Sequence, residues 1–179
     1  PIDEYCDAEG LTVEQRLRLF VKVCEGVHHA HLKGIIHRDL KPANILVGKT
    51  EGGAAIPRVI DFGLAKALAH DISEQTLDTL SGGFLGTPTY MSPEQASGKV
   101  AEIDARTDIY SLGVLLYRLL TGQVPVDPLA MRSKSAAEIQ RLICEDVPPK
   151  PSSLVGRLGD AALEVAERRG VGPEALRKQ

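Results

Sequence analysis

The stretch IHRDLKPAN at residues 36–44 and the triplet DFG at residues 61–63 say most about the fold of this chain. They place two acids and one amide, Asp39, Asp61 and Asn44, on adjoining loops. Carboxylate and amide oxygens are hard ligands that suit magnesium, an ion that usually keeps several of its waters. Such a site has to be completed by phosphate oxygens. The two motifs together therefore predict a magnesium site that phosphate completes.

A helix is expected immediately before the first motif. Six residues recur at every third or fourth position over residues 12–32, namely Leu17, Phe20, Val21, Cys24, Val27 and His31. This periodicity is typical of an amphipathic helix. Thr12 is a suitable N-cap for it, and Gly34 is a suitable residue to end it.

A β-hairpin is expected between the two motifs. Two short runs rich in apolar and β-branched residues, 45–47 and 58–60, flank a glycine-rich stretch at residues 48–57. Runs of this kind with such a connection predict a hairpin with an extended loop. A single Asp or Asn here would more often be a turn residue than a ligand. The joint order and spacing of the two motifs favour the ligand interpretation.

The second half of the chain is predicted to be mainly helical. Residues 109–120 are strongly apolar and stop at Thr121-Gly122, which predicts a buried central helix. Residues 67–86 are predicted to form a long functional loop, and residues 135–144 an amphipathic surface helix. The Pro and Ser cluster at residues 148–153 is predicted to break the fold, and residues 160–169 to form a last, loosely attached helix.

Two further motifs complete a family resemblance, GTPTYMSPE at residues 86–94 and DIYSLG at residues 108–113. With the first two motifs they resemble the eukaryotic-type (Hanks-type) serine/threonine protein kinases. PEQ at residues 93–95 and DIYSLG are most similar to bacterial members, and EYCD at residues 4–7 resembles planctomycete-type members. The resemblance implies an α+β protein kinase-like fold, here the mainly helical C-terminal lobe with a small β-hairpin.

The resemblance also implies roles for the residues of the two loops. Asp39 would accept the proton of the substrate hydroxyl, and Lys41 would place its charge against the transferred phosphoryl group. Asn44 and Asp61 would hold the magnesium ions that bridge the phosphates of ATP, with manganese as a possible substitute. Lys41 is also typical of kinases that act on serine and threonine, so the expected partners are ATP and a protein substrate.

Other residues are expected to shape the substrate side of the site. In the family, Thr87 would hydrogen-bond the catalytic aspartate and lysine. Arg38 would pair with a phosphorylated residue of the activation loop. Thr79 and Ser81 are the best candidates for that phosphorylation, and Thr76 is a weaker one.

Two acidic residues are expected to be structural. Asp108 would accept hydrogen bonds from the backbone near His37 and Arg38. Glu94 normally pairs with an arginine that in the family lies beyond the point where this sequence stops. We therefore expect Glu94 to lack that partner.

The resemblance covers residues 1–150 and leaves residues 151–179 as an uncharacterised tail. No glycine-rich strand pair, strand lysine or helix glutamate precedes Pro1, so the N-terminal lobe of a kinase is absent from this sequence. We expect residues 1–179 alone to have negligible activity.

Composition excludes several other classes of protein. The chain has 21 Lys and Arg against 24 Asp and Glu, and this balance offers no bulk attraction to nucleic acid or to anionic lipid. No stretch approaches the roughly 20 apolar residues of a membrane span. Three widely spaced cysteines suggest reduced thiols and a cytoplasmic kinase domain, although the parent protein could carry a membrane anchor.

Two rival functions stay open at this point. A pseudokinase-like scaffold would share the fold, but it would have no need of the intact Asp39, Lys41, Asn44 and Asp61. A small-molecule phosphotransferase of related fold would share the aspartate and asparagine loop, but it would not need the substrate-docking run at residues 86–94.

Overall fold

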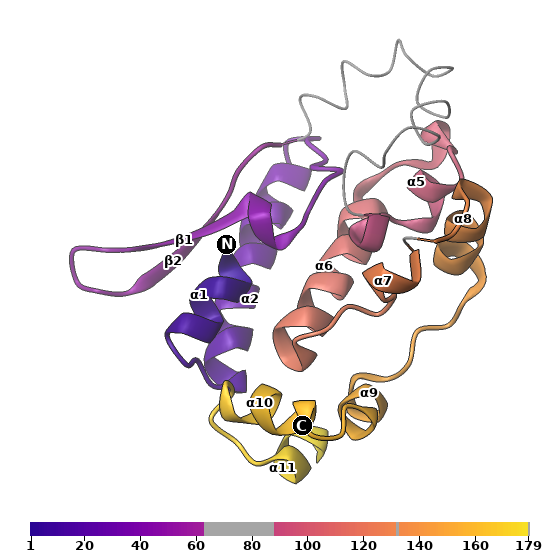
Figure 1. Cartoon of the computed structure of the whole chain (residues 1–179). Coiled ribbons are helices and arrows are strands. Elements are labelled where there is room, and N and C mark those ends of the chain that lie inside the picture. Colours follow the sequence, from indigo (N-terminus) through magenta and orange to yellow (C-terminus); the bar gives the residue numbers. More distant parts are fainter. Residues whose placement is uncertain (63–87, 132, 179) are drawn as a thin grey trace.

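The computed structural model describes residues 1–62, 88–131 and 133–178. In this part of the chain, helices dominate and a single antiparallel sheet of two strands is present. The helix and strand elements are, in order, α1 (Ile2–Ala8), α2 (Val13–His31), η1 (Pro42–Asn44), β1 (Ile45–Lys49), β2 (Ala55–Val59), η4 (Pro88–Tyr90), α5 (Pro93–Ala96), η5 (Val100–Glu102), α6 (Ala105–Thr121), α7 (Pro128–Met131), α8 (Ala136–Glu145), α9 (Pro151–Arg157), α10 (Ala161–Glu167) and α11 (Pro173–Lys178). Helices α2 and α6 form the middle of the molecule, and the sheet lies on the α1–α2 side (Figure 1).

The predicted helix over residues 12–32 is confirmed as α2. Its N-cap Thr12 forms a capping box, in which the Thr12 hydroxyl accepts from the Gln15 N–H and the Gln15 side chain accepts from the Thr12 N–H. The buried face agrees with the predicted one only in part. Val27 is buried and Phe20 and Cys24 pack against the core as predicted. Leu17 and Val21, however, are exposed at 38% and 53%. The buried positions are Val13, Arg16, Leu19, Val23, Val27 and Ala30.

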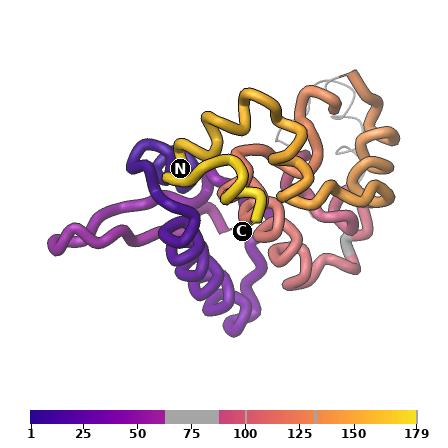
Figure 2. The backbone as a smooth tube through the Cα atoms, turned by 90° about the horizontal axis from the view of Figure 1, so that it is seen from below, coloured from indigo at the N-terminus to yellow at the C-terminus, as the bar shows by residue number. Residues whose placement is uncertain are grey.

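The predicted hairpin is confirmed, and it is longer than expected. Pairing runs from Ile45 opposite Val59 to Lys49 opposite Ala55, so the strands use half of the stretch assigned to the loop. The turn is closed by the Ala54 N–H, which donates to the Thr50 hydroxyl at 3.0 Å. The hairpin extends away from the helices, as Figure 2 shows.

The predicted central helix is confirmed as α6, which begins four residues earlier than expected, at Ala105. Asp104 caps its first turn by accepting a hydrogen bond from the Arg106 N–H at 2.8 Å. Gly122 ends the helix with a φ of 72°, a left-handed conformation that glycine adopts without steric cost.

The main core joins α1, α2, β1 and α6. Its buried members are Ile2, Cys6, Leu19, Val23, Val27, Leu40, Ile45, Leu112, Leu115 and Leu119. Leu40 lies in the first motif and Ile45 directly follows it, and both are fully buried. The motif is thus anchored in the core at both of these points; between them Pro42 and Asn44 are also buried, and Ala43 is exposed.

A smaller hydrophobic cluster joins α5, α7 and α8. Ile139 and Ile143 of α8 pack with Met131, and Met91 and Ala96 pack against them. Helix α8 is therefore amphipathic as predicted, and its apolar face packs against α5. The Ser135 hydroxyl caps α8 in a second capping box with Glu138.

The chain after residue 150 is more ordered and better packed than predicted. Helix α9 begins at Pro151, inside the segment assigned as a break, because proline is favoured in the first turn of a helix. Helix α10 was expected to be loosely attached, yet Ala162 and Ala166 are buried and pack with Val13 of α2. Arg169, just after α10, is 1% exposed.

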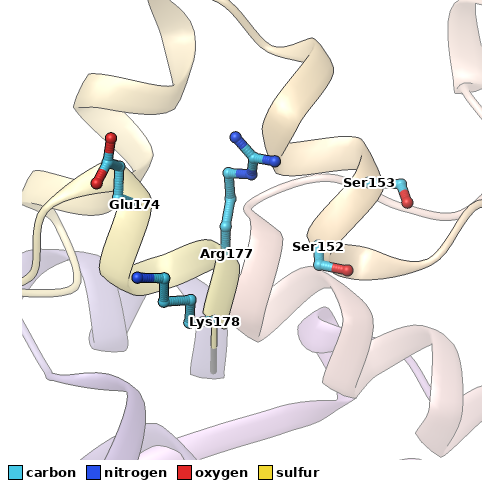
Figure 3. A pocket seen from close by; sticks show the side chains of 5 residues that line it. All are labelled: Ser152, Ser153, Glu174, Arg177 and Lys178. Atoms are coloured by element: carbon cyan, nitrogen blue, oxygen red, sulfur yellow. The ribbon is translucent and has the colours of Figure 1, made fainter.

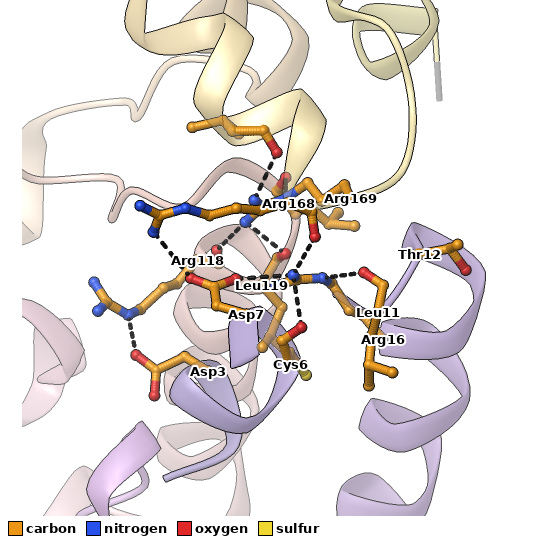
Figure 4. A network of polar contacts seen from close by, with 12 residues as sticks. Asp3, Cys6, Asp7, Leu11, Thr12, Arg16, Arg118, Leu119, Arg168 and Arg169 are labelled. Atoms are coloured by element: carbon orange, nitrogen blue, oxygen red, sulfur yellow. Dashed lines mark hydrogen bonds and ion pairs between the residues drawn. The ribbon is translucent and has the colours of Figure 1, made fainter. Parts of the chain in front are cut away.

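Buried arginines join this C-terminal part to the rest of the molecule (Figure 4). Arg169 donates to the carbonyl oxygens of Leu119 at 3.0 Å and Leu120 at 2.5 Å, in the last turn of α6. Arg16 donates to the carbonyl oxygens of Cys6 at 3.0 Å and Arg168 at 2.8 Å. The final carbonyls of a helix lack partners within it, so these side chains satisfy the ends of several helices at once.

The three cysteines differ in their surroundings and are all free. Cys6 is fully buried, and burial raises the pKa of its thiol to about 11. Cys24 is half-buried, and burial also raises its pKa. Cys144 is exposed, with its sulfur 3.4 Å from the Ser97 hydroxyl.

Candidate active site

The first motif, at residues 36–44, follows the end of α2, and its loop is held in place by a buried histidine. The His37 ring is fully buried. Its Nε2 lies 2.9 Å from the Ile60 carbonyl oxygen, and its Nδ1 accepts from the Asp39 N–H at 3.2 Å. A carbonyl can only accept, so these two partners select the tautomer with the proton on Nε2. His37 therefore fixes the loop of Asp39 against the segment that leads to Asp61.

The structure brings three of the predicted site residues into direct contact. Lys41 Nζ donates to Asp39 Oδ2 at 2.8 Å. Asn44 Nδ2 donates to the same oxygen at 3.2 Å and to the Asp39 carbonyl oxygen at 2.8 Å. The Asp39 side chain is 36% exposed, so solvent or a substrate can reach it. A carboxylate held in this way is oriented but still accessible.

Asp61 is placed next to this cluster by the backbone. The Ile60 N–H donates to the Asn44 carbonyl oxygen at 2.9 Å, which ties the second motif to the first. Asp61 is exposed and has a φ of 57°, a conformation that is uncommon for a residue with a side chain. Phe62 packs on His37 with ring centroids 4.8 Å apart. The two halves of the predicted metal site thus lie on neighbouring, mutually bonded loops.

These residues fit a hard divalent ion on the chemistry of their donors. Asn44 uses its amide nitrogen to bond Asp39, so the amide oxygen is the atom that remains for a ligand. Asp61 offers two carboxylate oxygens at an exposed position. In the described residues no group of three or more His, Cys, Asp and Glu could hold a metal ion. A pair of oxygen donors suits magnesium with phosphate and water as its other ligands.

Asp108 holds the loop from the side opposite to solvent. Its buried carboxylate accepts from the backbone N–H groups of His37 and Arg38, both at 2.8 Å. These are the contacts expected from the sequence. The sequence analysis missed a further donor, His31, whose Nε2 lies 2.7 Å from Asp108 Oδ2. His31 belongs to the helical repeat of α2, and that repeat alone gave no signal of a polar role.

Glu94 has a hydrogen-bond partner in the first turn of α6. It accepts a hydrogen bond from the Thr107 hydroxyl, which is fully buried in the first turn of α6. Burial opposes ionisation of Glu94, but hydrogen bonds from Thr107, the backbone and Ser92 outweigh it and lower its pKa. Within residues 1–62, 88–131 and 133–178, Glu94 forms no ion pair with an arginine, and whether it has the arginine partner usual in the family stays a prediction.

Some of the predicted residues cannot be placed. Thr76, Thr79, Ser81 and Thr87 lie outside the described residues, as does Gly63 of the DFG motif. Their proposed roles in phosphorylation and substrate docking stay predictions. Two further residues had no signal in the sequence motifs: Leu46 follows Asn44 by two positions, and Gln95 Nε2 donates to the Arg38 carbonyl oxygen at 2.7 Å.

An open pocket lies elsewhere, between α9 and α11 (Figure 3). It has a volume of about 360 Å³ and is lined by Ser152, Ser153, Glu174, Arg177 and Lys178. This part of the chain packs at the start of α2, whereas the Asp39 loop follows the end of that helix. The pocket is therefore remote from the candidate active site.

The fold and the site together define a class of protein. A buried central helix holds a loop with an aspartate, a lysine and an asparagine in contact, and a hairpin leads from that loop to a second aspartate. This is the arrangement of the helical lobe of a kinase-type phosphotransferase.

Comparisons with known proteins agree with this class. The family described as "Protein kinase domain" matches residues 2–163, and the chain belongs to this family. It is 40% identical to the serine/threonine-protein kinase Pkn1 of Myxococcus xanthus over 80% of this chain and 19% of that protein. It is 42% identical to PknB of Mycobacterium leprae over 63% of this chain and 16% of that protein.

Several relatives are thus bacterial serine/threonine kinases, and a specific similarity to planctomycete kinases stays a prediction. A third relative, pkn3 of Myxococcus xanthus, is 38% identical over 86% of this chain and 26% of its own length. The chain therefore spans about a quarter or less of these three relatives. In the described part of the chain, no helix is both long and apolar enough to cross a membrane.

Proposed function

We propose that the protein containing this chain transfers the γ-phosphate of ATP to serine and threonine hydroxyls of other proteins. The observation that carries this proposal is the accessible Asp39 carboxylate, whose Oδ2 accepts hydrogen bonds from both Lys41 and Asn44. The three relatives described above are serine/threonine kinases, and this supports the choice of acceptor.

Asp39 acts on the proton of the acceptor hydroxyl. The hydroxyl oxygen attacks the γ-phosphorus, its proton passes to the Asp39 carboxylate, and ADP leaves with the electrons of the broken P–O bond. Positioned proton acceptors of this kind contribute about 10²- to 10⁴-fold to rate. Lys41 lies 2.8 Å from Asp39 and carries a mobile positive charge, which can move to the phosphoryl oxygens as they gain charge.

Asn44 and Asp61 hold a divalent metal ion, magnesium with manganese as an alternative. When bound, such an ion neutralises part of the charge on the phosphates of ATP. The contribution of this chain is to keep the two oxygen ligands on neighbouring loops. The Ile60–Asn44 backbone bond and the His37–Ile60 bond serve this purpose.

Leu46 offers an apolar surface for the nucleotide base. It is 44% exposed, whereas its neighbour Ile45 is fully buried, because side chains alternate between the two faces of a strand. It follows Asn44 by two positions, so an apolar face lies beside the proposed phosphate site. We assign this face to the base of ATP.

The kinase domain is proposed to act in the cytoplasm, where ATP and reduced thiols are found.

The test is phosphate transfer from labelled ATP to a serine- or threonine-containing protein by the full-length protein, with and without magnesium. The variant D39N should lower the rate by at least about 100-fold, because it removes the proton acceptor. A matched control is D146N, an exposed aspartate in the chain after α8. Labelling that is unaffected by D39N would contradict the proposal. ATP binding without transfer in the wild type would favour the pseudokinase-like scaffold.

A further inference from the structure

Gln95 joins the short helix α5 to the catalytic loop through the two ends of one amide. Its Oε1 accepts from the Ser92 N–H at 3.1 Å, and the Ser92 hydroxyl accepts from the Gln95 N–H at 3.4 Å, which forms a capping box. Its Nε2 donates to the Arg38 carbonyl oxygen at 2.7 Å, across a sequence separation of 57 residues. A capping residue needs only the first of these contacts.

The chemistry of the partners fixes the orientation of this amide. The Ser92 N–H can only donate and the Arg38 carbonyl can only accept, so the oxygen must face Ser92 and the nitrogen must face Arg38. Glutamate could replace glutamine in the capping box, since an oxygen is sufficient there. It could not donate to Arg38 when ionised. The second contact is therefore specific to glutamine.

The carbonyl that Gln95 holds belongs to an unusual residue. Arg38 has a φ of 66°, a conformation that residues with side chains rarely adopt. Such a conformation persists when surrounding contacts over-determine it. Here the Arg38 N–H is held by Asp108 Oδ1 at 2.8 Å, and its carbonyl is held by Gln95. Two side chains from separate segments thus hold both backbone groups of this residue.

The contact also bears directly on Asp39. The Arg38 carbonyl and the Asp39 N–H belong to the same planar peptide unit. The Asp39 side of that unit donates to His37 Nδ1 at 3.2 Å. Rotation of the unit would move the Asp39 carboxylate, and the hydrogen bond from Gln95 resists that rotation from the other side.

We propose that Gln95 is a positioning residue for Asp39, and that it couples the placement of α5 to that of the catalytic loop. The inference rests on the proposed function only for the role of Asp39. Because α5 begins at Pro93, inside the run at residues 86–94 that is predicted to dock the substrate, a shift of that segment reaches Asp39 through Gln95.

The decisive variant is Q95E in the full-length protein, because it keeps the capping oxygen and removes the donor to Arg38. We expect kcat for phosphorylation of a serine or threonine peptide to fall about 10- to 100-fold, since small misplacements of reacting groups have effects of this size. The KM for ATP should stay within about 2-fold, because the nucleotide contacts do not involve the Arg38 carbonyl. The midpoint of thermal unfolding should stay close to that of the wild type.

The comparison variant is Q95A, which loses both contacts. If capping of α5 were the only role of Gln95, Q95A would be impaired and Q95E would match the wild type, and that result would overturn the proposal. Impairment of both variants in kcat supports it.

A second measurement does not depend on activity, so it separates this inference from the proposed function. Amide hydrogen exchange in the peptide covering residues 36–40 should be faster in Q95E than in the wild type, while exchange in α6 stays the same. Unchanged exchange in residues 36–40 would refute the positioning role even if the wild type proved to have no kinase activity.

Discussion

The Asp108 carboxylate is fully buried and accepts three hydrogen bonds, one from the His31 ring and two from backbone N–H groups. Each donor would be costly to leave unpaired inside the molecule. The backbone contacts could be anticipated from the resemblance of residues 108–113 to a kinase helix. The contact with His31 could not, because a histidine in a helical repeat is compatible with packing, with solvent or with an ion pair.

Glu94 gives a prediction about pH. Its pKa is lowered in the folded state, so its ionised form adds stability above the usual value of 4.5, and this stability is lost as the pH falls through the lowered value. The variant T107V removes the hydroxyl and keeps the shape of the side chain. We expect the pKa of Glu94 to rise in T107V, as measured by carbon-13 NMR titration of the carboxyl group. Equal pKa values in both proteins would show that Thr107 is not the cause.

The type of each long helix followed from the sequence, whereas the buried face of α2 followed from it only in part. Apolar periodicity favoured Leu17 and Val21, yet Arg16 is buried beside them. Arginine is rarely buried unless it is paired, and Arg16 is buried because its guanidinium reaches three carbonyl oxygens and, at 2.8 Å, the Asp7 carboxylate. Those acceptors come from other elements. A pattern within one helix cannot reveal them.

The strand ends and short helices were also hard to predict, for a related reason. Glycine and proline at residues 48–57 favour a loop, but Thr50 closes a tight turn and lets pairing continue to Lys49 and Ala55. Helix α1, with seven residues, is too short for its periodicity to be convincing. Its burial against α2 and α6 stabilises it instead.

Two glycines of α6 should respond in opposite directions to the same change. G122A forces alanine into a φ of 72° and should lower the free energy of unfolding by about 1 kcal/mol. G113A lies within the helix with open space around the added methyl group, and it should raise the free energy of unfolding by about 0.5–1 kcal/mol. Urea denaturation of both variants tests this. A loss of stability in G113A would contradict the prediction, because it would mean that the added methyl group meets other atoms at this position.

At the scale of the whole molecule, the chain after residue 150 is part of the helical lobe. The sequence offered no motif there, because arginine side chains hold this part through backbone carbonyl oxygens. Every residue has such a carbonyl, so the sequence does not indicate which ones are bonded. Burial and the nearby Arg16 lower the pKa of Arg169 to about 10, so it stays charged at neutral pH. Its positive charge lies at the C-terminal end of α6, where the helix dipole favours a cation.

Adjacent arginines give a matched pair for testing this attachment. R169M leaves the carbonyl oxygens at the end of α6 without donors and should lower the free energy of unfolding by about 3 kcal/mol. Arg168 has a side chain that is 56% exposed, and R168M should cost about 0.5 kcal/mol. Denaturant titration of the two proteins compares them directly. Equal, small effects would indicate that α10 and α11 separate easily from the lobe.

The graded burial of the three cysteines has a practical consequence for experiments on this protein. A thiol reacts as the thiolate, so the raised pKa values of Cys6 and Cys24 disfavour their reaction, whereas the exposed Cys144 is open to reagents. A maleimide fluorophore should therefore attach first at Cys144, whose sulfur lies 3.5 Å from the Pro93 carbonyl oxygen at the start of α5. The native chain thus carries its own attachment point for a dye that reports on movement of α5 against α8, with no engineered cysteine.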